Sequence, residues 1–238
     1  VSNSFKGTFD GDGHTISGLK IVNISKNLQN VGLFGVLDGA VVKNLVIEDA
    51  RVYGYNHVGI LAGQIKGESV ITDVTVEGTA AANTSSGGYA SDAAVGGLAG
   101  KIFGSSSGSR ATIENVTATV NTVNLGATSK TGGIAGEVSN AYIVDTSVSA
   151  TGNNILGRYY VGGIVGAMSS GTSLYNVSVD GTIGGNGAYA VGGITGYYEG
   201  GEIVVARMFG EIGKTNAGTA REGIFIGTRK DSVDMKYG

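Results

Sequence analysis

Acidic residues close to the beginning of the chain are the first whose types and spacing could do chemistry. Asp10, Asp12 and His14 alternate with glycines in the segment Asp-Gly-Asp-Gly-His. Carboxylate oxygens at alternating positions in a glycine-rich turn suit Ca²⁺, and the same sequence is typical of a tight turn with glycines at positive φ. An EF-hand loop would require Glu at its twelfth position, and counting from Asp10 this position holds Ile21. We therefore favour the turn and expect neither a bound metal nor a cofactor.

A second set of candidates recurs in five similar segments, of which Val42-Lys-Asn-Leu-Val-Ile47 is the first. The third position of these segments alternates between amide and carboxylate side chains. If the segments stack, each Asn can donate to an Asp in a neighbouring coil, and the carboxylates lie about 10 Å apart. Calcium binding or acid catalysis by clustered Asp is the alternative, but we find no Lys or Arg in the same column. We expect no catalytic residue here but a structural corner ladder of Asn44, Asp73, Asn115, Asp145 and Asn176.

Tyrosine is the commonest aromatic residue, with 11 copies, and many of them stand beside a glycine-containing phrase that recurs along the chain. A line of rings on one wall could stack sugars or contact a protein; rings that only cover the outer face of the glycine strand are the alternative. We select Tyr159, Tyr160 and Tyr189 as candidate binding residues, because Tyr159 and Tyr189 both stand two residues before the phrase in neighbouring repeats. The other tyrosines beside the phrase are Tyr53, Tyr55 and Tyr89, which precede it, and Tyr197 and Tyr198, which follow it.

The glycine-containing phrase occurs seven times and sets the architecture. Its starts lie 27, 37, 36, 30, 30 and 31 residues apart. A repeat of this length, built from strand-like phrases, indicates a solenoid rather than a compact globule. The phrases are Val31-Gly-Leu-Phe-Gly, Val58-Gly-Ile-Leu-Ala-Gly, Val95-Gly-Gly-Leu-Ala-Gly, Thr131-Gly-Gly-Ile-Ala-Gly, Val161-Gly-Gly-Ile-Val-Gly, Val191-Gly-Gly-Ile-Thr-Gly and Glu222-Gly-Ile-Phe-Ile-Gly.

Each repeat contains two or three short strands, two tight corners and a loop of variable length. The alternation of apolar residues breaks at the Asn or Asp, as expected for a corner between strands. We assign the stretches from Gly78 to Ala94 and from Thr119 to Lys130 to the variable loops. The pattern predicts one all-β domain over residues 1–238, a right-handed parallel β-helix of about seven to eight coils. One interior column is expected to contain Ile16, Val42, Ile71, Ile113, Ile143, Leu174 and Ile203.

Composition agrees with stacked strands. The chain has 44 glycines and no Pro, and a stack needs nearly every N–H that a Pro would lack. The net charge is −3 without a basic stripe, so we expect no nucleic-acid partner. No run of 18 apolar residues is present, so we expect no membrane insertion. Because the chain starts at Val1 without a signal segment, we expect a fragment of a larger protein. We also expect this fragment to be a monomer.

The phrase resembles the GLUG motif of bacterial cell-surface proteins. Gly97-Leu-Ala-Gly100 and Gly163-Ile-Val-Gly166 carry the motif, and the opening Phe5-Lys-Gly-Thr-Phe-Asp-Gly-Asp-Gly-His-Thr-Ile16 is similar to the first coil of those proteins. The resemblance covers almost the whole chain. The family includes immunoglobulin A1 protease-type zinc metalloproteases, in which such repeats lie outside the catalytic domain, and adhesin-like proteins. The metalloprotease motif His-Glu-x-x-His is absent here, so no catalytic residue is carried over.

The resemblance implies a non-catalytic module of a secreted protein on the bacterial cell surface. It would act as a spacer and as an adhesion or substrate-recognition surface toward a host protein or glycan. A carbohydrate-active β-helix enzyme is the alternative, and it would require clustered acids and bases on one wall. We expect no paired acid and base in neighbouring coils. Ice binding would require aligned Thr columns, and we expect Thr117 and Thr119 to lack such partners in neighbouring coils.

Overall fold

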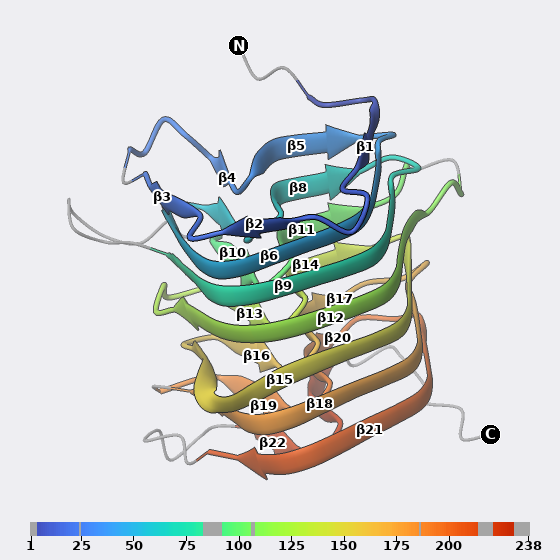
Figure 1. Cartoon of the computed structure of the whole chain (residues 1–238). Coiled ribbons are helices and arrows are strands. Elements are labelled where there is room, and N and C mark those ends of the chain that lie inside the picture. Colours follow the sequence, from blue (N-terminus) through green and yellow to red (C-terminus); the bar gives the residue numbers. More distant parts are fainter. Residues whose placement is uncertain are drawn as a thin grey trace.

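The computed structural model describes residues 4–23, 25–82, 92–105, 108–185, 187–213 and 221–230, with the side chains of 151–153 left aside. These residues form an all-β, right-handed parallel β-helix of seven turns (Figure 1). In Figure 1 the front strands run leftward and the strands behind them run rightward while the chain descends, so the coil is right-handed. The described part of the chain contains no helix that could cross a membrane.

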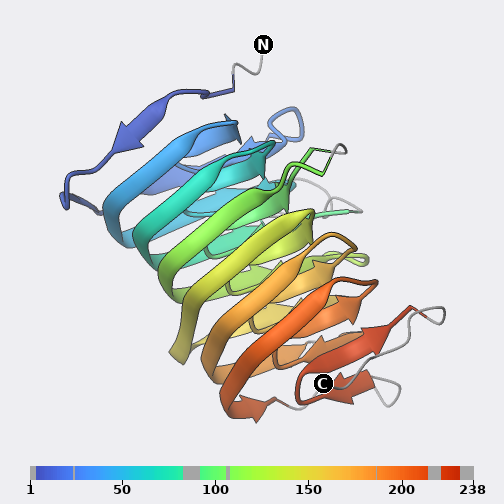
Figure 2. The same cartoon turned by 90° about the vertical axis from the view of Figure 1, so that its right-hand side faces the viewer.

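Three parallel sheets run along the solenoid, and each turn contributes to all of them (Figure 2). Sheet 1 contains β1 (Thr8–Asp10), β2 (Thr15–Ser17), β3 (Lys20–Val22), β6 (Val41–Gly54), β9 (Val70–Ala82), β12 (Ala111–Asn124), β15 (Ala141–Gly157), β18 (Ser173–Gly185) and β21 (Glu202–Ile212). Sheet 2 contains β4 (Asn30–Val31), β7 (His57–Val58), β10 (Ala94–Gly96), β13 (Lys130–Gly132), β16 (Tyr160–Gly162), β19 (Ala190–Gly192) and β22 (Arg221–Gly223). Sheet 3 contains β5 (Phe34–Asp38), β8 (Ala62–Lys66), β11 (Ala99–Phe103), β14 (Ala135–Ser139), β17 (Val165–Met168), β20 (Thr195–Tyr198) and β23 (Ile226–Arg229).

The predicted interior column is present, with one correction at its first member. The register of sheet 1 aligns its other six members, from Val42 to Ile203, in successive strands. Ile16 was wrongly assigned, because it lies opposite Ile47, while Phe9 lies opposite Val42. The first coil is interrupted by a turn in which the His14 N–H donates to the Gly11 carbonyl. This turn separates β1 from β2 and shifts the alignment of the first coil.

Part of the stretches that we assigned to loops belongs to sheet 1. Strand β9 continues through Ala82 and β12 continues through Asn124, so the variable segments begin later than the sequence suggested. The long strands bend a second time at Gly78, Gly181 and Gly210, where φ is 142°, 124° and 121°. A side chain at Gly78 would collide with the carbonyl of Ala50 in the preceding coil. Strand pairing thus continues around a bend that sequence alternation does not reveal.

Glycines of the repeated phrase allow sheets 2 and 3 to lie against each other. A Cβ atom added at Gly100 would lie 2.6 Å from the backbone nitrogen of Val58, and one at Gly136 would lie 2.5 Å from that of Val95. Only glycine permits such an approach, because any side chain would meet backbone rather than a mobile group. The first residue of each of the first six phrases is buried, as at Val58 and Val95, whereas Glu222 of the last phrase is exposed. The two sheets therefore form a narrow corner whose flanking side chains point outward.

Candidate functional site

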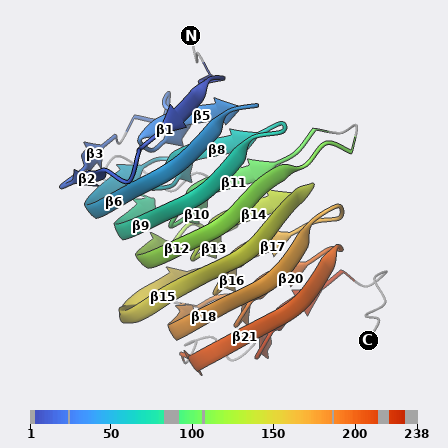
Figure 3. The same cartoon turned by 45° about the vertical axis from the view of Figure 1, so that its right-hand side comes forward.

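The five Asn and Asp residues of the corner column lie at one bend of sheet 1. They belong to the neighbouring strands β6, β9, β12, β15 and β18, whose order Figure 3 shows. All five adopt the left-handed conformation, with φ between 48° and 55°. Asn and Asp tolerate this conformation better than other residues with a side chain. The Asn115 Nδ2 group donates to Asp73 Oδ1, and Asn176 Nδ2 donates to Asp145 Oδ1 over 2.6 Å. The column is therefore hydrogen-bonded within itself, in pairs that join neighbouring coils.

Asp10 joins this ladder from the first coil. Its Oδ1 atom accepts hydrogen bonds from Asn44 Nδ2 and from the backbone N–H of Asp12, each over 3.0 Å. Lys43 Nζ lies 3.0 Å from its other oxygen. The hydrogen bonds from Asn44, Asp12 and Lys43 lower the pKa of Asp10 to about 2. Both carboxylate oxygens thus have partners within the chain.

Basic residues also reach the ladder, although, as predicted, none stands in its column. Lys43 is paired with Asp10, and the Arg207 guanidinium donates to Asn176 Oδ1 over 2.8 Å. Neither Lys43 nor Arg207 occupies the Asn/Asp column itself, because Lys43 stands one residue before it and Arg207 two residues after it in the strand register. Column position alone therefore misses partners that approach from adjacent columns.

A second, more varied set of side chains lies on the outside of the corner between sheets 2 and 3. The residue just before each phrase and the residue just after it flank this corner, and we call their two columns the outer wall, although the smaller members Ala94, Ala167 and Ala190 are themselves buried. In the strand registers these two positions form continuous columns. The preceding positions are Asn30, His57, Ala94, Lys130, Tyr160, Ala190 and Arg221, and the following ones are Val36, Gln64, Lys101, Glu137, Ala167, Tyr197 and Thr228.

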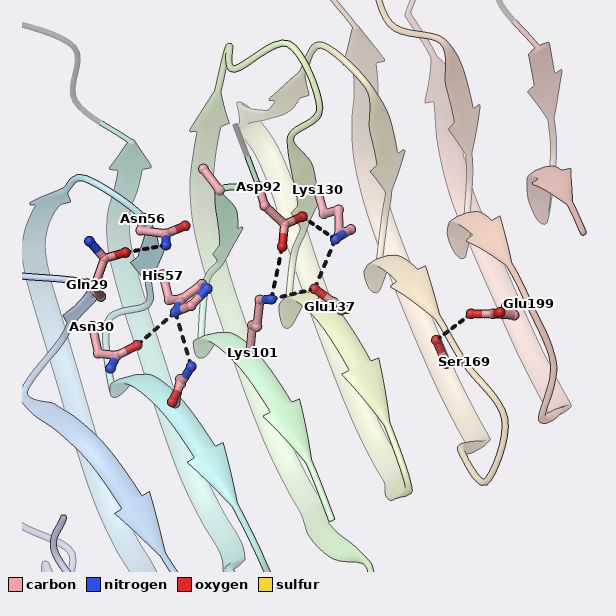
Figure 4. A network of polar contacts seen from close by, with 12 residues as sticks. Gln29, Asn30, Asn56, His57, Asp92, Lys101, Lys130, Glu137, Ser169 and Glu199 are labelled. Atoms are coloured by element: carbon pink, nitrogen blue, oxygen red, sulfur yellow. Dashed lines mark hydrogen bonds and ion pairs between the residues drawn. The ribbon is translucent and has the colours of Figure 1, made fainter. Parts of the chain in front are cut away.

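His57 is the centre of a polar cluster at one end of the outer wall (Figure 4). Its Nδ1 atom lies 2.8 Å from Asn30 Oδ1 and 3.1 Å from Gln64 Nε2. Burial, assisted by the positive charge of Lys101, lowers the pKa of His57 to about 4. The imidazole is therefore neutral near pH 7. A histidine that acts as a general base at this pH would need a pKa closer to 7.

Four charged residues form the next part of the outer wall. Lys130 Nζ lies 2.6 Å from Asp92 Oδ1 and 3.0 Å from Glu137 Oε2. Lys101 Nζ lies 2.9 Å from the same Glu137 oxygen and 3.4 Å from Asp92 Oδ2. The two lysine side chains are only 18% and 17% exposed, so both ammonium groups are held inside the network. We expected no paired acid and base in neighbouring coils, and this quartet corrects that expectation (Figure 4).

The quartet is ionised rather than poised for proton transfer. Burial alone would raise the pKa of Glu137, but the hydrogen bond from Lys101 and the charges of Lys130 and Lys101 outweigh it and lower that pKa. Burial likewise opposes the charge of Lys130, yet Asp92 and Glu137 together raise its pKa. Both shifts move the pKa values further from pH 7, whereas general acids and bases work best with a pKa near the working pH.

The three selected tyrosines come together further along the outer wall. The ring centroids of Tyr159 and Tyr189 are 5.1 Å apart with nearly parallel planes, and those of Tyr159 and Tyr160 are 4.4 Å apart. Tyr197 stacks on Tyr160 at 4.6 Å, and the Arg221 guanidinium lies 5.0 Å from the Tyr189 centroid. We call these five residues the tyrosine cluster. Burial and the hydrogen bond to Tyr159 raise the pKa of Tyr160, which keeps its hydroxyl protonated.

The arrangement of the rings limits how they could hold a ligand. Tyr189 is contacted by Tyr159 from the preceding coil and by Arg221 from the following one. A sugar therefore cannot stack on a free face of this ring without displacing a neighbour. Tyr189 remains 37% exposed, so ring edges, hydroxyls and the guanidinium are what the cluster presents to a partner.

The remaining tyrosines lie elsewhere or outside the described residues. Tyr198 is buried, and its hydroxyl donates to the Gly201 carbonyl over 2.7 Å. Tyr55 has Lys26 Nζ 6.0 Å from its ring centroid, and Tyr53 lies near the end of β6. Tyr89 lies outside the described residues. The tyrosine cluster is thus confined to the fifth, sixth and seventh coils.

Hydroxyl side chains form a column on sheet 1 that the sequence analysis missed. Thr117 pairs with Thr75 on one side and Ser147 on the other, so its expected lack of partners was wrong. Thr119 lies between Glu77 and Ser149. A carboxylate therefore interrupts the second column, and the aligned Thr pairs that ice binding would require do not extend across it.

Within the described residues, no group of three or more His, Cys, Asp or Glu could hold a metal ion. Sequence reasoning missed the outer wall because its positions vary in residue type from coil to coil. Reading together the residues just before and just after each phrase would have placed Lys130 beside Glu137, whereas Tyr160 and Tyr197 flank two successive phrases and would not have been paired in this way. Asp92 gives no such signal, because it belongs to a variable loop.

Comparisons with known proteins cover a limited part of the chain. No family model matches it, and no solved structure matches it. Halomucin of Haloquadratum walsbyi (strain DSM 16790 / HBSQ001) is 44% identical to this chain over 86 residues. The aligned segment is 36% of this chain and 1% of Halomucin. The chain is therefore similar to a small part of a far longer protein, and the GLUG resemblance stays a prediction.

Proposed function

We propose that this β-helix is a non-catalytic module of a secreted cell-surface protein, serving as a spacer and as a recognition surface. The observation that carries the proposal is the tyrosine cluster, where four rings and Arg221 gather on one side of a rigid solenoid. Tyr and Arg are enriched where proteins bind partners. The expected partner is a host protein or a glycan, bound through ring edges, hydroxyls and the guanidinium.

Location outside the cell is supported by two observations. Part of the chain is similar to Halomucin, and the repeated phrase resembles a motif of secreted surface proteins. A protease-like parent of the immunoglobulin A1 type belongs to the same proposal. A His-Glu-x-x-His motif in the flanking sequence of the parent would support it, and a surface anchor without that motif would favour an adhesin.

The non-catalytic assignment is supported by how the polar groups are used. The quartet of Asp92, Lys101, Lys130 and Glu137 neutralises itself, and its pKa shifts lead away from neutrality. The corner ladder is hydrogen-bonded within itself. An enzyme would instead need an acid and a base free to meet a substrate.

The test is a binding screen of the protein on glycan and host-protein arrays, followed by Tyr159→Ser together with Tyr189→Ser. Under the proposal the array signal falls at least about tenfold while the free energy of unfolding changes little. The matched control is Tyr142→Ser together with Tyr175→Ser, which removes two exposed rings from sheet 1 and leaves binding intact. If no array signal exists and the first pair costs several kcal/mol, the rings are structural and recognition is refuted.

A further inference from the structure

The corner ladder contains a sequence motif that its hydrogen bonds do not explain. The chain has the triplet Asn-x-Ser/Thr four times, beginning at Asn23, Asn83, Asn115 and Asn176. In secreted proteins this triplet is the acceptor of N-linked sugars, provided that its middle residue is not Pro. Asn83 and Ile24, the middle residue of the first triplet, lie outside the described residues. The other two triplets belong to the ladder.

Both ladder triplets present their amide and their hydroxyl on the outside of sheet 1. Asn115 and Thr117 are exposed, and Val116 between them is buried in the core. The second triplet follows the same pattern, with Asn176 and Ser178 half-buried on either side of an enclosed valine. The two groups that define the triplet are therefore accessible together, in the middle of the solenoid as well as further along it.

The ladder uses only one N–H of each of these amides. A side-chain amide has two N–H donors. Asn115 Nδ2 donates to Asp73 Oδ1, and Asn176 Nδ2 donates to Asp145 Oδ1 over 2.6 Å. Among the residues that the structure describes, neither nitrogen has a second acceptor. An N-linked sugar replaces one of the two hydrogens and leaves the other, so the ladder can keep its hydrogen bonds after the modification.

Other coils contain the same bend without a complete acceptor. Asn44 Nδ2 donates within the ladder in the same way, but the residue two positions later is Val46. Asp73 precedes Thr75 at the required spacing, yet a carboxylate has no N–H to replace. Among the described ladder positions, amide and hydroxyl coincide only in β12 and β18. These strands lie two coils apart, so their sugars would be about 10 Å apart at the base.

We infer that Asn115 and Asn176 are N-glycosylated, an inference that rests on the secretion proposed above. The amide Nδ2 attacks C1 of an oligosaccharide carried on a polyprenyl phosphate. The N–C1 bond forms while the C1–O bond breaks, the phosphate leaves with the bonding electron pair, and the Nδ2 proton passes to a base of the transferring enzyme. The sugars would line one bend of sheet 1 and leave the tyrosine cluster, which borders sheets 2 and 3, open to a partner.

The test is a glycopeptide map by mass spectrometry of the chain expressed in the cells that naturally encode it. Extracellular and cytosolic fractions are analysed separately. We expect the extracellular chain to carry sugars at Asn115 and Asn176 and none at Asn44. Thr117→Val removes the hydroxyl but keeps the ladder amide, so the sugar at Asn115 alone should be lost. Val46→Thr is the matched gain and should add a sugar at Asn44, because it completes the triplet in the same column.

The possible failures are distinguishable. An extracellular chain with unmodified Asn115 and Asn176 would overturn the glycosylation and leave the proposed secretion intact, whereas a chain found only in the cytosol would overturn both. Sugar that persists at Asn115 after Thr117→Val would also contradict the inference, as would the absence of sugar from Asn44 after Val46→Thr. Circular dichroism of each variant establishes that it is folded before the maps are compared.

Discussion

The middle coils and the last coil contain the same columns in different surroundings. Ile113 is fully buried in the third of the long strands, while Ile203, in the same column, is only partly buried. Ile134 is fully buried within its phrase, and Phe225, at the equivalent position of the last phrase, is 47% exposed. Burial in a solenoid is supplied by the coils above and below. The residue pattern therefore determines which side chains share a column. The position of a coil in the stack determines how much burying each of these side chains stabilises the fold.

The largest expected effect compares the middle of one column with its last member. Ile113→Ala should lower the free energy of unfolding by about 2–5 kcal/mol, because a fully enclosed cavity cannot collapse. Ile203→Ala should cost about 1 kcal/mol or less, since its side chain is partly open to solvent. Urea denaturation of both variants measures the difference. Equal losses would show that burial does not depend on position in the stack.

Acid should weaken the N-terminal end of the outer wall through His57. The pKa of His57 is lowered to about 4, so protonation favours the unfolded chain, where the pKa is near 6.5. Its contribution to stability is complete above pH 6.5 and is lost as the pH falls toward 4, by about 2–3 kcal/mol in total.

The measurement is the free energy of unfolding between pH 4 and pH 7 for the wild type and for His57→Gln. The variant should lack the additional slope in this window, whereas His14→Gln, which changes the exposed histidine of the first coil, should retain it. Identical slopes in all three proteins would contradict the role of His57.

The smallest expected effect comes from exchanging residues at one bend. Val205 takes the ladder position in the last coil with φ of 54°, and Asn115 takes it in the middle with φ of 52°. A β-branched residue is strained in this conformation. Val205→Asn should therefore raise stability by about 0.5–1 kcal/mol, and Asn115→Val should lower it by about 1–2 kcal/mol. Thermal unfolding measures both, and a destabilising Val205→Asn would contradict the account.

Much of the fold could be predicted because its signals repeat. The glycine phrase fixed the period and the number of coils, and the alternation of Asn and Asp located the bend. The first coil could not be aligned correctly, since an extra turn separates Phe9 from Ile16 and three short strands replace one long strand. A repeat consensus carries no information on such an irregular terminal coil.

The candidate sites divide in the same way. Tyr159 and Tyr189 share a phrase position, so their proximity followed from the repeat. Stacking by Tyr197 and Arg221 did not, because these side chains arrive from other strands and later coils. The quartet was missed because its members have different residue types at equivalent positions, and Asp92 reaches it from a loop. To predict contacts between neighbouring columns one must know the width and curvature of the coil, and these cannot be read from the repeat pattern.

The direction of the inter-coil hydrogen bonds has a mechanical consequence. These bonds run along the long axis of the solenoid, since every sheet pairs one coil with the next. A pull on the chain ends along this axis acts mainly on the hydrogen bonds that hold a terminal coil. The coils therefore detach one after another, beginning at an end. Each detached coil of about 30 residues extends to about 100 Å. Under tension such a rod yields in steps and limits the force that it transmits between its two ends.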